Sequence, residues 1–257
     1  MSGHSKWASI KHKKGAADQK RGKVFSKFVR EISVAARLGG GDPGSNPRLR
    51  AVVAKAKQFN MPSDNIEKAI KKGTGELPGV AYEEIAYEGY GPGGVALIVN
   101  CLSDNKNRTS SEIRNIFDKK KGRMAGAGSV AWNFAKKGFI AVEKSAVEED
   151  QLLALALDAG AEDCSAEEKE SYEIYTRPEA VEDVKKALDA QGIKYTVAEV
   201  ALIPKSTVAV SGRDAQQLLD LVEELEDHDD VQNVFTNADL PDELVEAAAR
   251  RERAGGA

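Results

Sequence analysis

The chain has few of the side chains on which most enzymes rely. Its 257 residues include only two cysteines, Cys101 and Cys164, and three histidines. No Walker A loop, HExxH motif, Ser-His-Asp order or cysteine-rich metal spacing is present. Two thiols do not make a disulfide framework, and His4 and His12 are too far apart for a helical metal pair. We therefore predict a protein that is not an enzyme and has no metal and no cofactor.

Long apolar runs are also missing. The longest are VALIV (95–99) and LLALAL (152–157), whereas a membrane helix needs about 20 apolar residues. No secretory signal is visible near the start, and the lysine-rich opening differs from an arginine- and serine-rich presequence. The sequence therefore predicts a cytoplasmic protein with packed cores and no membrane partner. It leaves the oligomeric state open and is compatible with a monomer.

Acidic residues are scarce at one end only. Residues 1–77 hold 17 basic and 6 acidic side chains, a net charge of +11, and the remainder holds 20 basic and 35 acidic side chains, a net charge of −15. Charge divided in this way indicates parts of a chain that meet different partners. We call residues 1–77 the basic head and the remainder of the chain the acidic body.

The head has helical periodicity. Apolar residues between Phe25 and Ala36 recur on one face of a predicted helix over 17–38, and lysines and arginines occupy the opposite face. A second helix is predicted after Asn46, with Pro47 in its first turn, and a third from Ser63 to about Gly73. These three amphipathic helices predict a small bundle. Residues 1–14 lack apolar periodicity and are predicted to form an arm.

From residue 80 the pattern alternates between strands and helices. Strands are predicted over 82–90 and 94–102, joined by a glycine turn, and then a helix with Thr109 and Glu112 in capping-box spacing. Further strands are predicted over 129–134, 138–144, 170–176, 195–203, 207–212 and 230–238. Helices are predicted over 148–160, 178–192 and 214–228. The unit that starts at residue 80 would be completed by the strand and helix after residue 205.

The predicted fold class is therefore α+β and multidomain. It combines an N-terminal three-helix domain with two α/β domains, each a sheet with helices on one face, one inserted in the other. The predicted boundaries are 1–78 for the basic helical domain with its arm, 79–136 and 205–240 for one α/β domain, 137–204 for the inserted one, and 241–257 for a C-terminal helical tail.

The basic head is the main candidate site. A surface of one charge sign repels itself unless an anion neutralises it, and the phosphate backbone of nucleic acid is the commonest such partner. An exposed Trp7 among lysines would stack on an unpaired base, or else fold back onto the bundle. The predicted nucleic-acid-binding residues are Lys6, Trp7, Lys11, His12, Lys13, Lys14, Lys20, Arg21, Lys23, Lys27 and Arg30.

A second contact surface is predicted from two further segments. The turn GYGPGG (89–94) matches a dinucleotide fingerprint formally, but a strand follows it where a helix is needed, so a hairpin is favoured. Polar residues at a helix start and a lysine run before a glycine-rich loop would contact phosphate, or would be only a cap and a floppy loop. The residues of this surface are Gly89, Tyr90, Gly91, Pro92, Gly93, Asn105, Asn107, Arg108, Lys119, Lys120, Lys121 and Arg123.

The acidic run EELEDHDD (223–230) is predicted to be the exposed face and end of a helix. It would also keep the body away from nucleic acid, so that only the head binds.

Several long motifs together resemble one family. GHSKWASIKHKKGAADQKRGKVFSK, NPRLRAVVAKAKQFNMPSDNIEKAIKKGTG, YEGYGPGGVALIV, SDNKNRT and VQNVFTNAD occur in order, and the resemblance runs from about residue 2 to 240. On these motifs the chain resembles the YebC/PmpR family, which includes the mitochondrial translational activator of cytochrome c oxidase. The resemblance implies a helical N-terminal domain and two α/β domains, one inserted in the other. Lys121 and Ala125 stand where glycines are usual in that family.

The resemblance implies two functions. Bacterial members are described as transcriptional regulators that bind DNA, and other members are associated with ribosomes and with relief of stalling at proline runs. The sequence therefore predicts a regulator of gene expression whose partner is DNA, or alternatively ribosomal or transfer RNA on the ribosome. A nucleotide-binding enzyme that uses the Gly89–Gly94 turn is the least favoured alternative.

Overall fold

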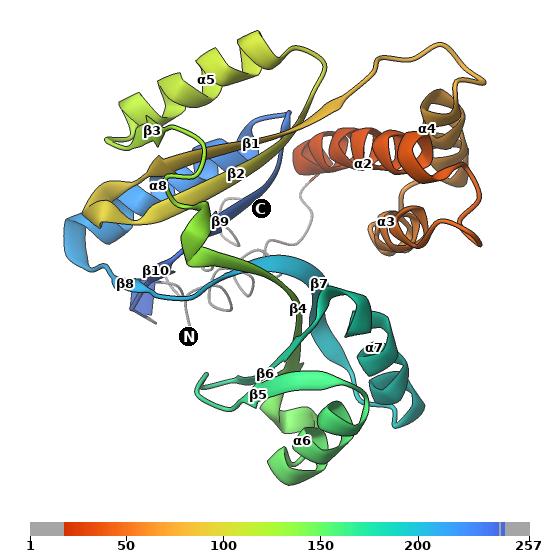
Figure 1. Ribbon diagram of the computed structural model, residues 1–257, viewed down its shortest axis with the longest axis vertical. Coiled ribbons are helices and arrows are strands. Elements are labelled where there is room, and N and C mark those ends of the chain that lie inside the picture. The colour runs from red at the N-terminus through yellow and green to blue at the C-terminus, as the bar shows by residue number, and fades with distance from the viewer. Residues whose placement is uncertain (1–17, 242, 245–257) are drawn as a thin grey trace.

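The protein is described here from a computed structural model that covers residues 18–241 and 243–244. It has three parts, one helical and two built on β-sheets (Figure 1). The predicted arm (1–14) and nearly all of the predicted C-terminal tail lie outside the described residues.

The helical part contains α2 (Asp18–Gly39), α3 (Pro47–Gln58) and α4 (Ser63–Thr74). The side chain of Asn46 accepts a 3.0 Å hydrogen bond from the Leu49 N–H, and Pro47 occupies the first turn, so α3 begins where the sequence predicts. The apolar faces of the three helices meet in one core. This core contains Phe28, Ile32, Ala36, Leu49, Val52, Ala56, Ile66 and Ala69.

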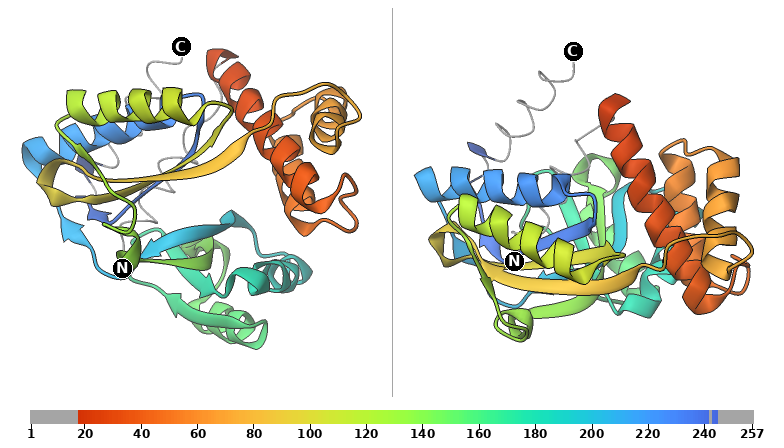
Figure 2. Two further views of the ribbon diagram at one scale, coloured as in Figure 1. Left: turned by 45° about the horizontal axis from the view of Figure 1, so that its top comes forward. Right: turned by 90° about the horizontal axis from the view of Figure 1, so that it is seen from above.

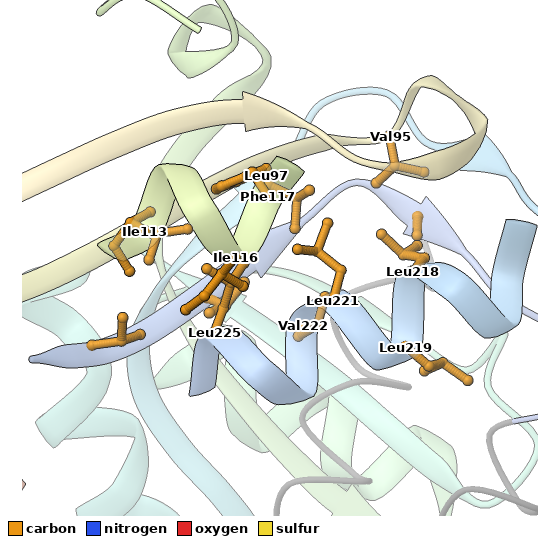
Figure 3. Close-up of a cluster of buried hydrophobic side chains, with 14 of the residues drawn as sticks. Val95, Leu97, Ile113, Ile116, Phe117, Leu218, Leu219, Leu221, Val222 and Leu225 are labelled. Carbon is orange, nitrogen blue, oxygen red and sulfur yellow. The ribbon is translucent and has the colours of Figure 1, made fainter. Parts of the chain in front are cut away.

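The first sheet has strand order β3-β1-β2-β9, with every neighbouring pair antiparallel. Its strands are β1 (Glu83–Tyr90), β2 (Ala96–Ser103), β3 (Arg123–Ala125) and β9 (Val231–Thr236). Helices α5 (Lys106–Lys119) and α8 (Gly212–Asp227) lie side by side over one face (Figure 2). Figure 3 shows the core beneath them, where Phe117 and Leu221 pack near Leu97 of the sheet.

The second sheet has strand order β5-β6-β4-β7, also antiparallel. Its strands are β4 (Phe134–Glu143), β5 (Ala161–Ser165), β6 (Ser171–Thr176) and β7 (Tyr195–Pro204). Helices α6 (Glu149–Asp158) and α7 (Val181–Ala190) cover one face. Alternation along β4 sends Ile140 toward these helices, whereas Phe139 faces a second core shared with Ile98 and Phe235 of the first sheet. The two sheets are therefore packed together through an apolar contact.

The described residues also contain four single-turn 3-10 helices: η1 (Pro92–Gly94), η2 (Ala131–Asn133), η3 (Lys144–Ala146) and η4 (Pro178–Ala180). One predicted strand is wrong, and another is much shorter than predicted. The segment 129–134 contains η2, and β4 begins only at Phe134. The segment 207–212 contains only β8 (Val208–Ala209), which pairs in parallel with β10 (Ala238–Asp239), outside both main sheets. Alternating apolar letters do not reveal whether a partner strand is within reach.

The fold class read from the sequence is confirmed: a three-helix part precedes two α+β parts, and the strands of the second sheet lie in the chain between those of the first. At the crossing point Phe134 of β4 is paired with Pro204 of β7. Within the described part of the chain, no helix has the length and apolarity needed to span a membrane.

Candidate nucleic-acid interface

Part of the predicted basic site can be placed. Lys6, Trp7, Lys11, His12, Lys13 and Lys14 lie outside the described residues, and Lys20 and Arg21 lie in the first turn of α2, where only the backbone is described. The remaining three residues, Lys23, Lys27 and Arg30, are spaced along one side of α2; we call them the α2 stripe.

The α2 stripe is not a free surface. Lys23 Nζ donates to the carbonyl oxygen of Asp227 at 3.2 Å, and Lys27 Nζ donates to that of Glu226 at 2.6 Å. The Arg30 guanidinium donates to the Asp229 carbonyl oxygen. The last carbonyls of a helix lack donors within the helix and carry partial negative charge, so cations are favoured there. The stripe therefore docks the helical part on the C-terminal end of α8, beside which α2 runs (Figure 2).

Asp230, just beyond α8, is the centre of this contact. Its carboxylate accepts from Thr109 Oγ1 at 2.6 Å and from the Arg108 guanidinium at 2.9 Å, and Arg30 approaches it to 3.4 Å. The residue is only 2% exposed. Burial raises the pKa of Asp230, but the hydrogen bonds from Thr109 and Arg108 and the charge of Arg30 outweigh burial and hold the pKa below its usual value. A buried, ionised carboxylate thus joins α2, α5 and α8.

This arrangement changes the interpretation of the 223–230 run. Main-chain carbonyls at the end of α8 accept the bonds from the α2 stripe, and the carboxylate that joins them is the buried Asp230. The run was predicted to be an exposed acidic face that keeps the body away from nucleic acid. Its C-terminal end instead holds the basic head.

Three potential metal ligands gather nearby. Oxygen and nitrogen atoms of Glu112, His228 and Asp230 lie within 4.8 Å of one another. His228 Nε2 lies 2.9 Å from Glu112 Oε2, and His228 Nδ1 accepts from the Asp230 backbone N–H. With the Arg108 guanidinium also bound to Asp230, protein cations and hydrogen bonds already satisfy these groups. The arrangement is that of an ion-pair network.

The GYGPGG turn is a hairpin connection, as the sequence predicts, with β1 and β2 paired up to Tyr90 and Ala96. Much of the turn is covered, however. Gly89, Gly91 and Pro92 are buried, and a Cβ at Gly91 would lie 2.9 Å from side-chain atoms of Leu218 and Leu97. These three residues are therefore withdrawn from the predicted second surface, because α8 and the sheet cover them. Gly93 is exposed at a φ of 74°, and Tyr90 is half-buried.

The other residues of the second surface divide into paired and free groups. Asn105 caps α5 by accepting from the Arg108 N–H at 3.1 Å, and Lys120 pairs with Glu224 at 3.0 Å. The Arg123 guanidinium lies 5.7 Å from the centre of the Tyr90 ring. Asn107, Lys119 and Lys121 are exposed and make no ion pair in the described part of the chain.

Two local predictions in this segment are wrong. Because α5 begins at Lys106 with Asn105 as its cap, Thr109 is an internal residue that binds Asp230 and is not the start of a capping box. The loop over 119–128 was predicted to have little reason to be rigid, but residues 123–125 form β3, paired with β1. Lys121 takes a φ of 59°, a conformation that favours glycine.

Two family models match nearly the whole chain. The model for the TACO1/YebC protein N-terminal domain matches residues 5–76, and the model for the TACO1/YebC second and third domain matches residues 82–238. The chain belongs to the TACO1/YebC family. The resemblance seen in the sequence motifs is thereby confirmed.

Relatives of this TACO1/YebC chain are named probable transcriptional regulatory proteins. One from Desulfatibacillum aliphaticivorans is 57% identical over 245 residues, covering 95% of this chain and 99% of the relative. One from Geobacter sulfurreducens is 56% identical over 246 residues, covering 96% and 99%. The crystal structure of a conserved hypothetical protein from Aquifex aeolicus superposes with a TM-score of 0.78 at 46% identity, covering 88% of this chain and 93% of that one.

Sequence reasoning missed three residues of this TACO1/YebC chain. Asp230 is buried at the head–body contact, Glu88 is buried beneath the loop between β3 and β4, and Trp132 in that loop is 67% exposed. Nothing in the local pattern distinguishes Asp230 or Glu88 from other acids. The sequence does mark Trp132, because it lies in the longest stretch of the body without an acidic residue, between Asp118 and Glu143.

Proposed function

We propose that this chain is a non-enzymatic, nucleic-acid-binding regulator of gene expression that acts in the cytoplasm, in the first place as a DNA-binding transcriptional regulator. The observation that carries the proposal is the segregation of charge, +11 over residues 1–77 against −15 over the rest. The names of its relatives support the same function. Phosphates would neutralise those positive charges of the head that the body does not neutralise.

Because the α2 stripe is docked on α8, fewer basic residues of the head are left for the proposed contacts with phosphate. Lys23, Lys27 and Arg30 already donate to the end of α8, so the proposed phosphate contacts are the six basic residues before them. These are Lys6, Lys11, Lys13, Lys14, Lys20 and Arg21. Exposed lysines on α3 and α4 that make no ion pair in the described residues would extend this surface: Lys57, Lys68 and Lys72.

The protonation state of the two thiols gives no support to catalysis by a cysteine. Burial raises the pKa of the Cys101 thiol to about 12, and burial also raises that of Cys164. A thiol acts as a nucleophile in its ionised form, so both side chains are expected to stay protonated and unreactive near neutral pH.

A translation factor that binds ribosomal or transfer RNA is the second candidate, and one feature of the head favours it. In helix-turn-helix proteins the N-terminal residues of the second helix contact base edges in the major groove. The helix that follows α3 after a short turn, α4, presents Asp64 and Glu67 near its start, both exposed, with Glu67 paired to Lys71. Carboxylates there would face the phosphates that flank the groove, which does not suit α4 as a recognition helix.

Ultraviolet crosslinking in living cells, followed by sequencing of the bound DNA and RNA together, tests the proposal. A Lys11/Lys13/Lys14→Glu variant is the control. Reads at promoters that are lost in the variant are the expected result for transcriptional regulation. Reads concentrated on ribosomal or transfer RNA would replace it with the translation function. If neither nucleic acid were recovered above the variant, the proposed function would be wrong.

A further inference from the structure

The loop between β3 and β4 holds an exposed tryptophan in a fixed position. Trp132 lies in η2, at the junction of the two sheets, where Figure 1 shows the chain passing from the first to the second. Its side chain is 67% exposed, more than any other large apolar side chain in the described residues. Single exposed apolar residues are common and need no explanation. The surroundings of this one are unusual.

The backbone of the loop is fixed from below by a carboxylate. Glu88 accepts hydrogen bonds from the backbone N–H groups of Gly128 and Val130, both at 2.7 Å, and of Ala131 at 2.9 Å. Although burial raises the pKa of Glu88, the bonds from these backbone groups lower it more, so the carboxylate stays ionised. Three charge-assisted bonds to consecutive parts of one loop leave it little freedom to rearrange.

The indole itself is oriented. Trp132 Nε1 donates to the Ser129 carbonyl oxygen at 3.0 Å, and Tyr90 Oη donates to the same oxygen at 3.1 Å. Lys205 Nζ donates to the Trp132 carbonyl oxygen at 2.8 Å. The polar edge of the indole is thus satisfied within the loop, and much of its apolar surface is left in water.

Two cations, Lys205 and Arg123, lie in the region of this ring. Lys205 contacts the Trp132 backbone, and Arg123 lies over Tyr90, whose hydroxyl binds the same loop. Between Asp118 and Glu143 the chain carries six basic residues and no acid, although Lys120 and Lys137 are paired with Glu224 and Glu162 from other segments. The buried Glu88 is already engaged by the loop. An aromatic surface with cations beside it is the arrangement on which single-stranded nucleic acid stacks a base and places its phosphates.

We propose that Trp132, with Lys205 and Arg123, forms a stacking site for an unpaired base of a single-stranded nucleic acid. This inference rests on the proposed function and adds to it a second contact point on the body, separate from the basic head. Duplex DNA offers no unstacked base, so the site distinguishes single strands from duplexes. RNA and DNA single strands share the chemistry, and the experiment compares them.

The experiment measures binding of the full-length chain to a labelled 12-nucleotide oligouridine, the matching oligothymidine and a duplex of mixed sequence, by fluorescence anisotropy. Stacking contributes about 1–3 kcal/mol per base, so we expect Trp132→Ala to weaken single-strand binding roughly 5- to 150-fold and to leave duplex binding unchanged. Trp132→Phe, which keeps an aromatic face, should lose less. Leu157→Ala is the matched control, because Leu157 is 46% exposed on α6.

A second readout is the emission of Trp132 itself, observed in a Trp7→Phe background. Saturable quenching by a single strand, and little by the duplex, is the expected result. Equal single-strand affinities for the chain and Trp132→Ala, with unchanged emission, would overturn the stacking site while leaving the proposed function intact. Emission that changes with protein concentration alone would also overturn it, in favour of an interface between copies. No binding of any nucleic acid at low salt would remove the proposed function as well.

Discussion

The α2 stripe and the segment over 119–137 carry the same sign of charge in very different surroundings. Lys23, Lys27 and Arg30 of the stripe donate to carbonyl oxygens more than 190 residues away, at the end of α8. In the segment over 119–137, Lys119 and Lys121 are exposed and make no ion pair within the described residues. The comparison teaches that a run of lysines indicates where positive charge lies, and that only the fold tells whether the protein itself supplies the anion.

Removing the carboxylate at the centre of the docked contact is expected to have the largest effect. Asp230→Ala leaves the Arg108 guanidinium and the Thr109 hydroxyl without their buried acceptor. Removing one partner of a fully buried ion pair costs about 3–5 kcal/mol. Because Arg108 is partly exposed and keeps Asp104 as a partner, we expect a loss at the lower end of that range, about 3 kcal/mol, in the free energy of unfolding. Urea unfolding followed by circular dichroism measures it.

Asp229→Ala is the control, since Asp229 is exposed and its backbone carbonyl, not its side chain, accepts from Arg30. It should change the stability by no more than about 0.5 kcal/mol. Equal losses in the two variants would mean that Asp230 does not hold the contact.

The pH dependence of stability follows from the same carboxylate. The pKa of Asp230 is lower in the folded chain than in the unfolded chain, so its contribution is present above the unfolded value of about 3.9 and is lost as the pH falls through the folded value. We expect the free energy of unfolding to fall as the pH drops below about 4. The fall should be smaller in Asp230→Asn, and parallel curves for the two proteins would contradict the assignment.

The salt dependence of nucleic-acid affinity separates the docked stripe from the free arm. The six phosphate contacts before the stripe predict a slope of log affinity against log salt of about −5, which is a loss of roughly 10³-fold between 50 and 200 mM, and contacts from Lys57, Lys68 and Lys72 would bring the slope to about −8. Lys11/Lys13/Lys14→Gln should reduce the slope by about 2.7. Lys23/Lys27/Arg30→Gln removes the same number of charges and should change the slope little, because α8 already holds them. Equal reductions would show that the stripe leaves α8 when nucleic acid binds.

The support beneath the β3–β4 loop is expected to contribute less than the Asp230 network but still measurably. Glu88→Ala removes the acceptor of three backbone N–H groups, and we expect the free energy of unfolding to fall by about 2–3 kcal/mol. The fluorescence anisotropy of Trp132 in the Trp7→Phe background should fall at the same time. Glu84→Ala on the same strand removes a surface pair with Arg48 and should cost no more than about 1 kcal/mol. A loop that stayed rigid in Glu88→Ala would contradict the role given to Glu88.

The smallest expected change in stability is at Lys121, where substitution by glycine should stabilise the protein. At a φ of 59° a glycine is less strained than a lysine, so Lys121→Gly should stabilise the protein by about 1 kcal/mol. Lys119→Gly removes the same charge from the last residue of α5 and should destabilise it by up to about 1 kcal/mol. Thermal unfolding distinguishes the two. A loss of stability in both variants would contradict the strain at Lys121.

The local elements of the head were predictable because their signals are local. Asn46 and Pro47 set the start of α3, and the spacing of Phe28, Ile32 and Ala36 fixes the buried face of α2. The β1–β2 hairpin followed from its glycine turn in the same way. The predicted strand over 129–134 failed, and the one over 207–212 is only the short β8, outside both main sheets. A strand needs a partner, and the sequence pattern does not say which segments come within hydrogen-bonding distance.

The candidate site was predictable only in its charge. The sequence by itself determined a basic head on an acidic body, three amphipathic helices and two alternating α+β parts, since periodicity and charge depend on neighbouring residues. The tertiary structure alone decided that the α2 stripe is docked, that Gly89, Gly91 and Pro92 are covered and that Trp132 is held exposed. Each of these depends on the packing of segments far apart in the chain: Lys23 and Asp227 are 204 residues apart. That packing decides whether a polar group contacts water or protein, and it therefore decides the free-energy cost of burying the group.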